Sequence, residues 1–249
     1  KNSDEAFDSM YEIEHTLLRR SAVLVKSATA SADVTIPSSV ELEEGGAKYN
    51  VTSIAESAFS SNTKLVNLTI PETIGTIGDN AFNGCSNLAV IVSNIVKPCK
   101  IASNVFSDYS ATLYIPANST VKDYSDNGWN FTNIFVGERK EVTLDDGMTF
   151  VYSTGDKKAM LTKVNSTDKD FTVPGSFKLE DVDYKVTAIG KNVFKDNKKI
   201  VNLTISENIV NIGAGAYLNC TTLKKVELPS TLDKIGDNAF DGCTAIAYI

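Results

Sequence analysis

The chain has 249 residues, of which 42% are hydrophobic, and its formal net charge is −7. This apolar content is enough for a buried core and excludes a disordered chain. Acidic and basic residues are interspersed and no apolar run approaches the ~20 residues of a membrane span, which argues against a nucleic-acid-binding surface and a transmembrane segment.

The beginning of the chain recurs in its middle. The segments "DSMYEI" and "DVTIPSS" match the later segments "DGMTFV" and "DFTVPGS". In the later copy, residues 148–164 read as strand, turn and strand, with "TGDK" as the turn. A solenoid must hide the apolar face of its first coil, so we predict a β-hairpin cap over residues 7–36 and another over residues 141–175.

A short motif follows each predicted hairpin and repeats about every 23 residues. Its six copies are "IAESAF" from Ile54, "IGDNAF" from Ile77, "IASNVF" from Ile101, "IGKNVF" from Ile189, "IGAGAY" from Ile212 and "IGDNAF" from Ile235. The apolar residues of one period fit neither a helical nor a strand spacing, as expected for a coil that turns corners. We therefore predict a mainly β solenoid with short helices and turns, its repeats over residues 50–115 and 185–249.

Each period also contains a predicted strand and an aromatic residue. The stretches "LVNLTI", "IVNLTI" and "LKKVEL" alternate as short strands do, and stacked coils place such strands side by side in a ladder. One aromatic recurs in every coil, which predicts a buried column of Phe59, Phe82 and Phe106 and a second one of Phe194, Tyr217 and Phe240. Asparagine often stands two residues before the aromatic, where we expect its side-chain amide to bond the turn backbone or its own copy in the next coil.

Residues 116–138 drop the repeat pattern and contain the only tryptophan, Trp129. We interpret them as a closing cap, with a short helix that begins after Ser119 or Thr120 and stops at Gly128. The stretch "DYSDNG" within them imitates half of a calcium loop, but Ile134 stands where the loop needs a glutamate, so a cap turn is favoured.

The chain therefore reads as two tandem units, residues 1–139 and 140–249. Residues 51–91 and 186–226 align without a gap and are identical at 18 of 41 positions. The final stretch "DGCTAIAYI" aligns with "SDYSATLYI" of the first unit, so the second unit has no closing cap, and the natural chain is expected to continue beyond Ile249.

The reactive residue types show no catalytic pattern. His15, the only histidine, aligns with the turn of the second hairpin, so a surface loop histidine is favoured over a catalytic one. Cys85, Cys220 and Cys243 fall at inward places; a disulfide between Cys220 and Cys243 is disfavoured because side chains on stacked coils are poorly angled for it. We expect no catalytic residue, no metal site and no cofactor.

The pattern I-G-x-N-A-F-x-x-C-x-x-L-x-x-[VI]-x-[IL]-P resembles the BspA-type leucine-rich repeats of bacterial surface proteins, common in Bacteroides-like organisms. The opening hairpin and the closing segment are also similar to those of such domains. Departures are Gly215 in the place of asparagine and the missing proline after "AVIVSN". The resemblance implies secretion or placement at the cell surface and, for some members, adhesion to host proteins or other cells.

We expect a non-catalytic extracellular or cell-surface protein that recognises a protein or glycan ligand, with host-derived ligands among the candidates. The alternative is a structural spacer that presents another domain, and an enzyme is the least favoured reading. Solenoids bind partners along extended faces. The predicted ligand-binding face consists of the outward ladder residues Asn67, Thr69, Val90, Val92, Tyr114, Asn202, Thr204, Lys225, Glu227 and Tyr248.

Overall fold

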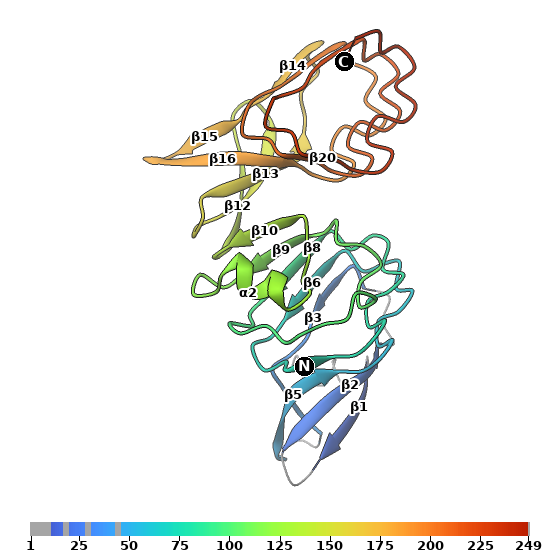
Figure 1. The fold of residues 1–249 in the computed structure, drawn as a ribbon, viewed down its shortest axis with the longest axis vertical. Coiled ribbons are helices and arrows are strands. Elements are labelled where there is room, and N and C mark those ends of the chain that lie inside the picture. The colour runs from blue at the N-terminus through green and yellow to red at the C-terminus, as the bar shows by residue number, and fades with distance from the viewer. Residues whose placement is uncertain (1–10, 17–19, 28–30, 43–45, 249) are drawn as a thin grey trace. The chain divides into compact units, whose positions relative to one another are not determined.

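The computed structural model describes residues 11–16, 20–27, 31–42 and 46–248, and it consists mainly of strands (Figure 1). The chain divides into two compact units, Lys1–Val136 and Gly137–Ile249. Each unit is a stack of coils in which one side of every coil is a short strand, so the solenoid architecture predicted from the repeats is confirmed.

The first unit opens with the predicted hairpin, strands β1 and β2, which pair antiparallel. Its sheet has the order β1-β2-β5-β4, and β7 pairs with β5. The strands are β1 (Tyr11–Thr16), β2 (Ser21–Ser27), β4 (Ser39–Glu41), β5 (Lys48–Ile54) and β7 (Thr76–Ile77). His15 lies in β1 opposite Ala22, so its predicted place in a loop is wrong; its side chain lies outside the described residues.

A second sheet of the first unit forms a parallel ladder in the order β10-β9-β8-β6-β3 (Figure 1). Its strands are β3 (Asp33–Thr35), β6 (Asn67–Ile70), β8 (Val90–Ser93), β9 (Thr112–Ile115) and β10 (Asn133–Val136). Two assignments are corrected by this order. Residues 33–35 belong to the ladder rather than to the hairpin cap, and the closing cap adds β10 as a further ladder strand.

The closing cap of the first unit contains the predicted helix, α2 (Val121–Asp126). Thr120 is its N-cap and forms a capping box with Asp123, and Gly128 follows the helix at φ +89°. Trp129 is fully buried and donates from Nε1 to the Cys99 carbonyl at 2.9 Å. The residues that imitate a calcium loop therefore form this helix and its C-terminal turn.

The second unit repeats the plan. One sheet has the order β11-β12-β13-β16-β18-β20, with β15 paired to β16, and the predicted hairpin is β12 with β13. Its strands are β11 (Arg139–Thr143), β12 (Met148–Ser153), β13 (Lys158–Val164), β15 (Ser176–Leu179), β16 (Val182–Ile189), β18 (Asn211–Ile212) and β20 (Lys234–Ile235). The parallel ladder is β14 (Asp170–Val173), β17 (Asn202–Ile205) and β19 (Lys225–Glu227), so residues 170–173 also leave the predicted hairpin cap.

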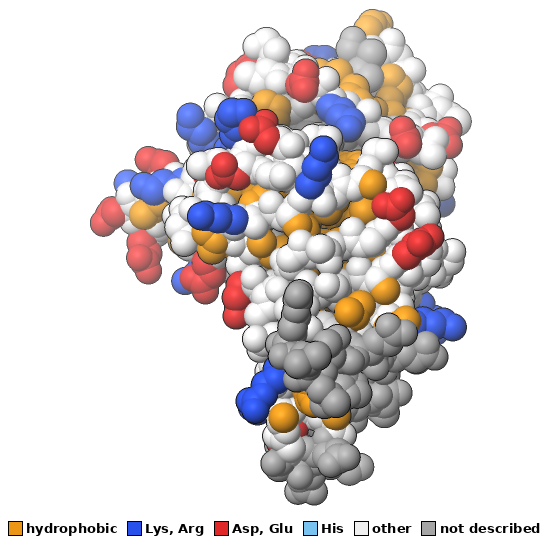
Figure 2. Space-filling model, turned by 60° about the horizontal axis from the view of Figure 1, so that its bottom comes forward, with side chains coloured by type: hydrophobic (Ala, Val, Ile, Leu, Met, Phe, Trp, Pro, Cys, Tyr) orange, Lys and Arg blue, Asp and Glu red, His pale blue; other side chains and the backbone are white. Residues whose placement is uncertain are grey.

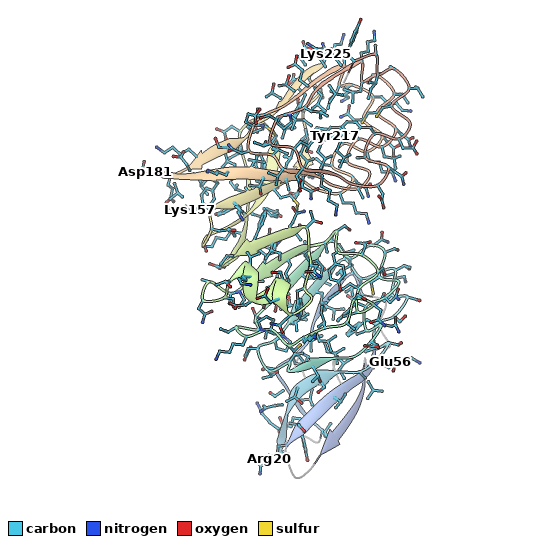
Figure 3. All side chains as sticks on the ribbon, viewed as in Figure 1. Arg20, Glu56, Lys157, Asp181, Tyr217 and Lys225 are labelled. Carbon is cyan, nitrogen blue, oxygen red and sulfur yellow. The ribbon has the colours of Figure 1, made fainter. Side chains whose placement is uncertain are left out.

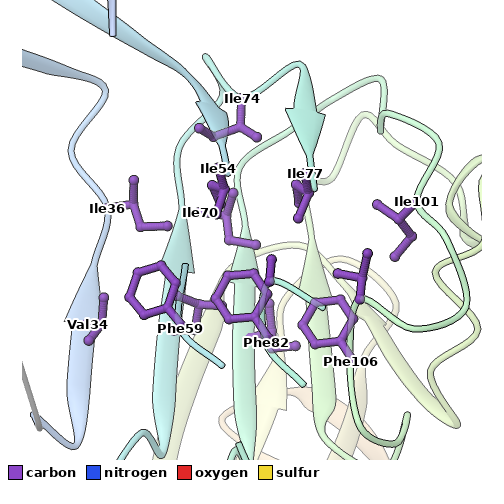
Figure 4. Packing of buried hydrophobic residues seen from close by; sticks show 14 of the residues in the cluster. Val34, Ile36, Ile54, Phe59, Ile70, Ile74, Ile77, Phe82, Ile101 and Phe106 are labelled. Atoms are coloured by element: carbon purple, nitrogen blue, oxygen red, sulfur yellow. The ribbon is translucent and has the colours of Figure 1, made fainter. Parts of the chain in front are cut away.

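Aromatic rings stack through the core of each unit as predicted. Phe59, Phe82 and Phe106 lie side by side along the stack, with centroids 5.0 and 5.2 Å apart and interplanar angles of 15° and 8° (Figure 4). In the second unit, Tyr217 stacks on Phe194 at 4.7 Å and on Phe240 at 5.0 Å. Because one ring follows another from coil to coil, each column ties its coils into one core.

The asparagine before three of the aromatics has a conformational role that its spacing did not indicate. Asn80, Asn192 and Asn238 all have φ between +55° and +59°, and Gly215 stands at the same place with φ +62°. Asparagine and glycine are the residues that enter this left-handed region most readily. Gly215 therefore meets the same backbone requirement as asparagine.

The inward cysteines are free thiols, and each donates to a carbonyl of the preceding coil. Cys85 Sγ donates to the Phe59 carbonyl, Cys220 Sγ to the Phe194 carbonyl and Cys243 Sγ to the Tyr217 carbonyl. Burial raises the pKa of Cys85 to about 11 and that of Cys220 to about 12. These thiols therefore act as small apolar side chains.

Tyr217 carries a hydroxyl group that its fully buried position does not satisfy. Among the described residues its Oη has no hydrogen-bond partner, and burial raises the pKa of Tyr217 well above its usual value. The corresponding residue of the first unit is Phe82, which needs no partner.

We expect Tyr217→Phe to stabilise the second unit by about 1 kcal/mol at pH 8, because an unsatisfied buried hydroxyl group is removed. Tyr217 ionises more easily in the unfolded chain than in the folded one. The free energy of unfolding of the unsubstituted protein is therefore unaffected by this ionisation below pH ~10 and falls above it. The advantage of Tyr217→Phe should therefore grow between pH 9 and pH 11. Calorimetric unfolding of both proteins across this range checks it, and a constant difference would contradict the assignment.

Candidate recognition surface on the strand ladders

The two ladders arrange outward side chains in rows because their strands are parallel and aligned. Side chains alternate between the two faces of a strand, so residues paired across the ladder point to the same side. In the first unit one outward row is Asp33, Asn67, Val90, Thr112 and Asn133, and the other is Thr35, Thr69, Val92, Tyr114 and Phe135.

The accessible part of the first ladder changes from polar to apolar along the stack. Asp33 is exposed and accepts a hydrogen bond of 2.5 Å from Asn67 Nδ2. Val90 and Val92 on the next strand are both half-buried, without any polar group of their own. Two valines on one strand at the outward positions form a small apolar patch beside the polar pair.

Tyr114 does not belong to this accessible surface, and its predicted exposure is wrong. It is only 1% exposed, and its ring packs edge-on against Phe135 with the centroids 5.4 Å apart. The prediction treated the strand of Tyr114 as the last of the ladder. The closing cap instead adds β10, which pairs Phe135 directly with Tyr114.

The ladder of the second unit is more polar and more exposed. Asn202 Nδ2 donates to Asp170 Oδ1 at 2.6 Å, which repeats the pair of the first unit. On the next strand, Lys225 Nζ lies 2.6 Å from Glu227 Oε1, and Thr204 donates to Glu227 Oε2 at 3.1 Å. Figure 3 shows Lys225 on the outer side of the ladder, whereas Tyr217 lies inside the coils.

The ion pair shifts the pKa values of both of its groups in the directions expected for opposite charges. Hydrogen bonding to Glu227 raises the pKa of Lys225, and hydrogen bonding from Lys225 and Thr204 lowers the pKa of Glu227. Both side chains are half exposed, so the pair contributes little to folding. It orders two charges at the surface, where a partner can reach them.

Tyr248 is the last residue of the second unit that the structure describes, and it is 74% exposed. It forms a bridge with Lys225 and therefore corresponds to Thr112 of the first unit, which follows Val90 in the same row. The sequence alignment, which placed Tyr248 opposite Tyr114, is off by two residues. The coil that begins at Ile101 has two fewer residues between its aromatic and its strand than the regular coils.

Nine of the ten predicted residues are therefore accessible, in two separate groups. Asn67, Thr69, Val90 and Val92 are neighbours on the first ladder, and the other five are neighbours on the second. The exposed residues of β3 and β14 also belong to these surfaces but were not predicted: Asp33, Thr35, Asp170 and Thr172. A signal was present, since "DVTIP" resembles the ladder stretch "NLTIP".

The second unit also contains a surface depression of about 400 Å³. It is lined by Val164, Asn165, Ser166 and residues 196–199. Its one carboxylate, Asp196, accepts a hydrogen bond of 3.0 Å from Asn219.

Within the described ranges, no three histidine, cysteine or acidic residues are grouped to hold a metal ion, and no helix has the length and apolar character of a membrane span.

Charges of both signs are interspersed on the face shown in Figure 2, with no large block of one sign. Such a surface does not attract a polyanion. On this face, the charges therefore produce no long-range field of a single sign.

Comparison with known proteins identifies the repeat. A family model described as "BspA type Leucine rich repeat region" matches residues 33–152 and 171–249 in six copies. Among solved structures, the chain is similar to a leucine rich cell surface protein from Faecalibacterium prausnitzii, with 18% identity over 97% of this chain and 81% of that chain and a TM-score of 0.37.

Two other solved structures are leucine-rich repeat proteins from Bacteroides species. That from Bacteroides ovatus is 18% identical over 96% of this chain and 80% of that chain, with a TM-score of 0.36. That from Bacteroides capillosus is 24% identical over 43% of this chain and 94% of that chain, with a TM-score of 0.35. No curated protein matches the chain.

Proposed function

Because this chain belongs to the BspA-type leucine-rich repeat family, we propose that it is a non-catalytic recognition protein of the bacterial surface or exterior that binds a protein or glycan ligand through its strand ladders. Leucine-rich repeats of this kind generally serve as interaction scaffolds. The observation that carries the proposal is the pair of accessible ladder faces with different chemistry.

The two faces suit different contacts. Val90 and Val92 offer apolar area beside hydrogen-bonding groups, the combination that forms the centre of many interfaces. Tyr248, next to Lys225, offers an exposed aromatic ring with a polar tip, and tyrosine is enriched among residues that dominate binding energy. An adhesive role for the chain follows if either face holds a host protein or another cell.

The internal symmetry of the chain supplies a sharp test. Val90 and Val92 occupy the same ladder positions as Lys225 and Glu227 in the second unit. The double substitution Val90→Lys with Val92→Glu gives a strand of the first ladder the outward side chains of its counterpart in the second. Lys225→Val with Glu227→Val makes the reverse exchange. Each of these pairs of outward residues is called a rung. Both changes lie on outward positions, so the core of each unit is left intact.

A screen on glycan and extracellular-matrix protein arrays, with a charge-matched repeat protein as control, should first identify a ligand. One exchanged rung is then expected to weaken that binding at least ten-fold, while the other leaves it unchanged. Binding that is indifferent to both exchanges and to Tyr248→Thr would contradict a ladder site.

A structural spacer that presents another domain is the second candidate. The interspersed charges of the surface favour it, because a spacer needs a soluble exterior without a binding patch (Figure 2). Silence on both arrays would support the spacer over recognition.

A further inference from the structure

The surface depression of the second unit lies where two segments of the chain enter the strand ladder. One wall is the segment 164–166, which leads into β14, and the other is the segment 196–199, which leads into β17. Because β14 and β17 pair in parallel, the segments that precede them meet at the same edge of the ladder. The backbone joins them there, since the N–H groups of Val201 and Asn202 both donate to the Lys169 carbonyl, at 2.7 and 3.0 Å.

Two lysines of this depression are not required by the coil that carries them. Lys198 and Lys199 follow the aromatic of their coil by four and five residues, and both are exposed. No other coil of the same length has a lysine at both places. The corresponding pairs are Thr63 and Lys64, Ser86 and Asn87, Thr221 and Thr222, and Thr244 and Ala245. The coil therefore forms without this pair, which leaves both side chains available for another role.

The positive charges around the depression are not neutralised by its aspartates. The segments 163–170 and 195–199 contain five lysines and three aspartates, although the whole chain has a net charge of −7. Each aspartate accepts from a neutral side chain: Asp168 from Ser166 at 2.7 Å, Asp170 from Asn202 at 2.6 Å and Asp196 from Asn219 at 3.0 Å. Neither Lys198 nor Lys199 forms an ion pair with a residue that the structure describes.

Two asparagines add neutral hydrogen-bonding groups to the lining. Asn197 Oδ1 accepts from the N–H groups of Lys199 and Ile200 at 2.8 and 3.1 Å, and its Nδ2 has no partner among the described residues. The side chain of Asn165 likewise forms no hydrogen bond within the described part of the chain. Ammonium groups only donate, and an amide nitrogen also donates. A ligand that suits this lining therefore brings oxygen acceptors and negative charge.

We propose that this depression binds an acidic sugar residue of a glycan, whose carboxylate or sulfate group contacts the ammonium groups of Lys198 and Lys199. The side chains of Asn165 and Asn197 bond hydroxyl groups of the same sugar. A volume of about 400 Å³ is typical of small-ligand sites. An acidic peptide fits less well, because Val164 is the one apolar residue of the lining and peptides are commonly held by apolar anchors or a free strand edge.

This site contains none of the outward ladder residues on which the proposed function rests, so either can fail without the other. Calorimetric titration of the full chain tests it with two acidic probes, a galacturonic acid trisaccharide and a sulfated chondroitin disaccharide, which separate carboxylate from sulfate recognition. A neutral galactose trisaccharide is the reference. At least one acidic probe should bind, and the neutral one should not.

Lys198→Gln with Lys199→Gln is expected to weaken that binding at least ten-fold, because two charge-assisted contacts are lost. Asn165→Ala should weaken it about three-fold without any change of charge. The matched control is Lys157→Gln with Lys185→Gln, which removes the same charge from two exposed lysines of the same unit. These two are also neighbours, since the Lys185 N–H donates to the Lys157 carbonyl at 3.0 Å. The control should leave the affinity unchanged.

Absence of binding by both acidic probes at millimolar concentration would overturn the proposal. An equal loss in the two pairs of lysine variants would also overturn it, since the attraction would then be non-specific. So would an oligo-aspartate peptide that binds as tightly as the acidic sugars, because a protein would then be the better ligand. The exchanged rungs should not affect this binding, and a loss on exchanging them would place the sugar on the ladder instead.

Discussion

Gly78→Ala is expected to destabilise the first unit by about 3 kcal/mol, because the coil has no room for one more methyl group. A Cβ atom at Gly78 would lie 2.4 Å from the Glu56 nitrogen and 2.8 Å from the Ala55 carbonyl carbon. Both are backbone atoms, so no side-chain rotation relieves the contact. The Gly78 N–H donates to the Ile54 carbonyl at 2.8 Å and holds the coils at this distance.

Gly75→Ala is the matched control, three residues earlier in the same coil. The nearest atom to its added Cβ is 3.9 Å away, and Gly75 has no positive φ. We expect a change within about 0.5 kcal/mol of zero for this exposed substitution. Urea unfolding followed by the fluorescence of Trp129, the only tryptophan and a residue of the first unit, measures both variants. Equal effects of the two substitutions would show that coil spacing is not what glycine provides.

The repeated glycine therefore allows the close spacing between coils. This role could not be predicted from the sequence alone. Gly213 and Gly236 stand at the equivalent place in the second unit, and a Cβ there would lie 2.7 and 2.5 Å from the neighbouring backbone. Ala102 replaces glycine where the stack changes: the N–H of Ile101 donates to the Asn127 carbonyl of the closing cap. A sequence repeat shows that a position is special, but the contact that makes it so lies one coil away.

The features that depend on the length of the repeat could be predicted from the sequence. A fixed period of apolar and aromatic residues determines which side chains face inward, so the columns of Phe82 and Tyr217 follow from the spacing of the repeats alone. The cap helix was equally accessible, because Thr120 and Gly128 carry local signals for its two ends.

The ladder's extent could not be predicted in the same way, since strand pairing is not local. The stretch around Asp33 pairs with a strand that lies 34 residues further along, and the burial of Tyr114 depends on a strand from the closing cap. The two-residue shortening of the third coil also shifted the alignment of Tyr248. The first two errors concern partners that are distant in sequence, and the third concerns the length of one coil. Together they changed which residues belong to the candidate recognition surface.

Phe82→Ala is expected to cost about 3–5 kcal/mol in the stability of the first unit, because it removes the middle ring of a buried column. Phe82 is fully buried and stacks on Phe59 and on Phe106. The coils on both sides are held by backbone hydrogen bonds, so they cannot collapse into the space left behind, and a cavity remains. The midpoint of urea unfolding, followed by Trp129 fluorescence, should fall with the slope unchanged.

Phe240→Ala is the matched comparison, because Phe240 ends the second copy of the same hexamer. Phe240 is only partly buried and stacks on a single ring, that of Tyr217, so its removal should cost the second unit about half as much or less. Hydrogen exchange at the amides of Phe194 and Tyr217 measures that loss, with the exchange of Phe59 as an internal reference in the first unit. Since the six residues around the two rings are identical, a difference between the variants comes from the coils that flank each ring. A loss at Phe240 as large as that at Phe82 would contradict a dependence of the cost on burial and on the number of stacked rings.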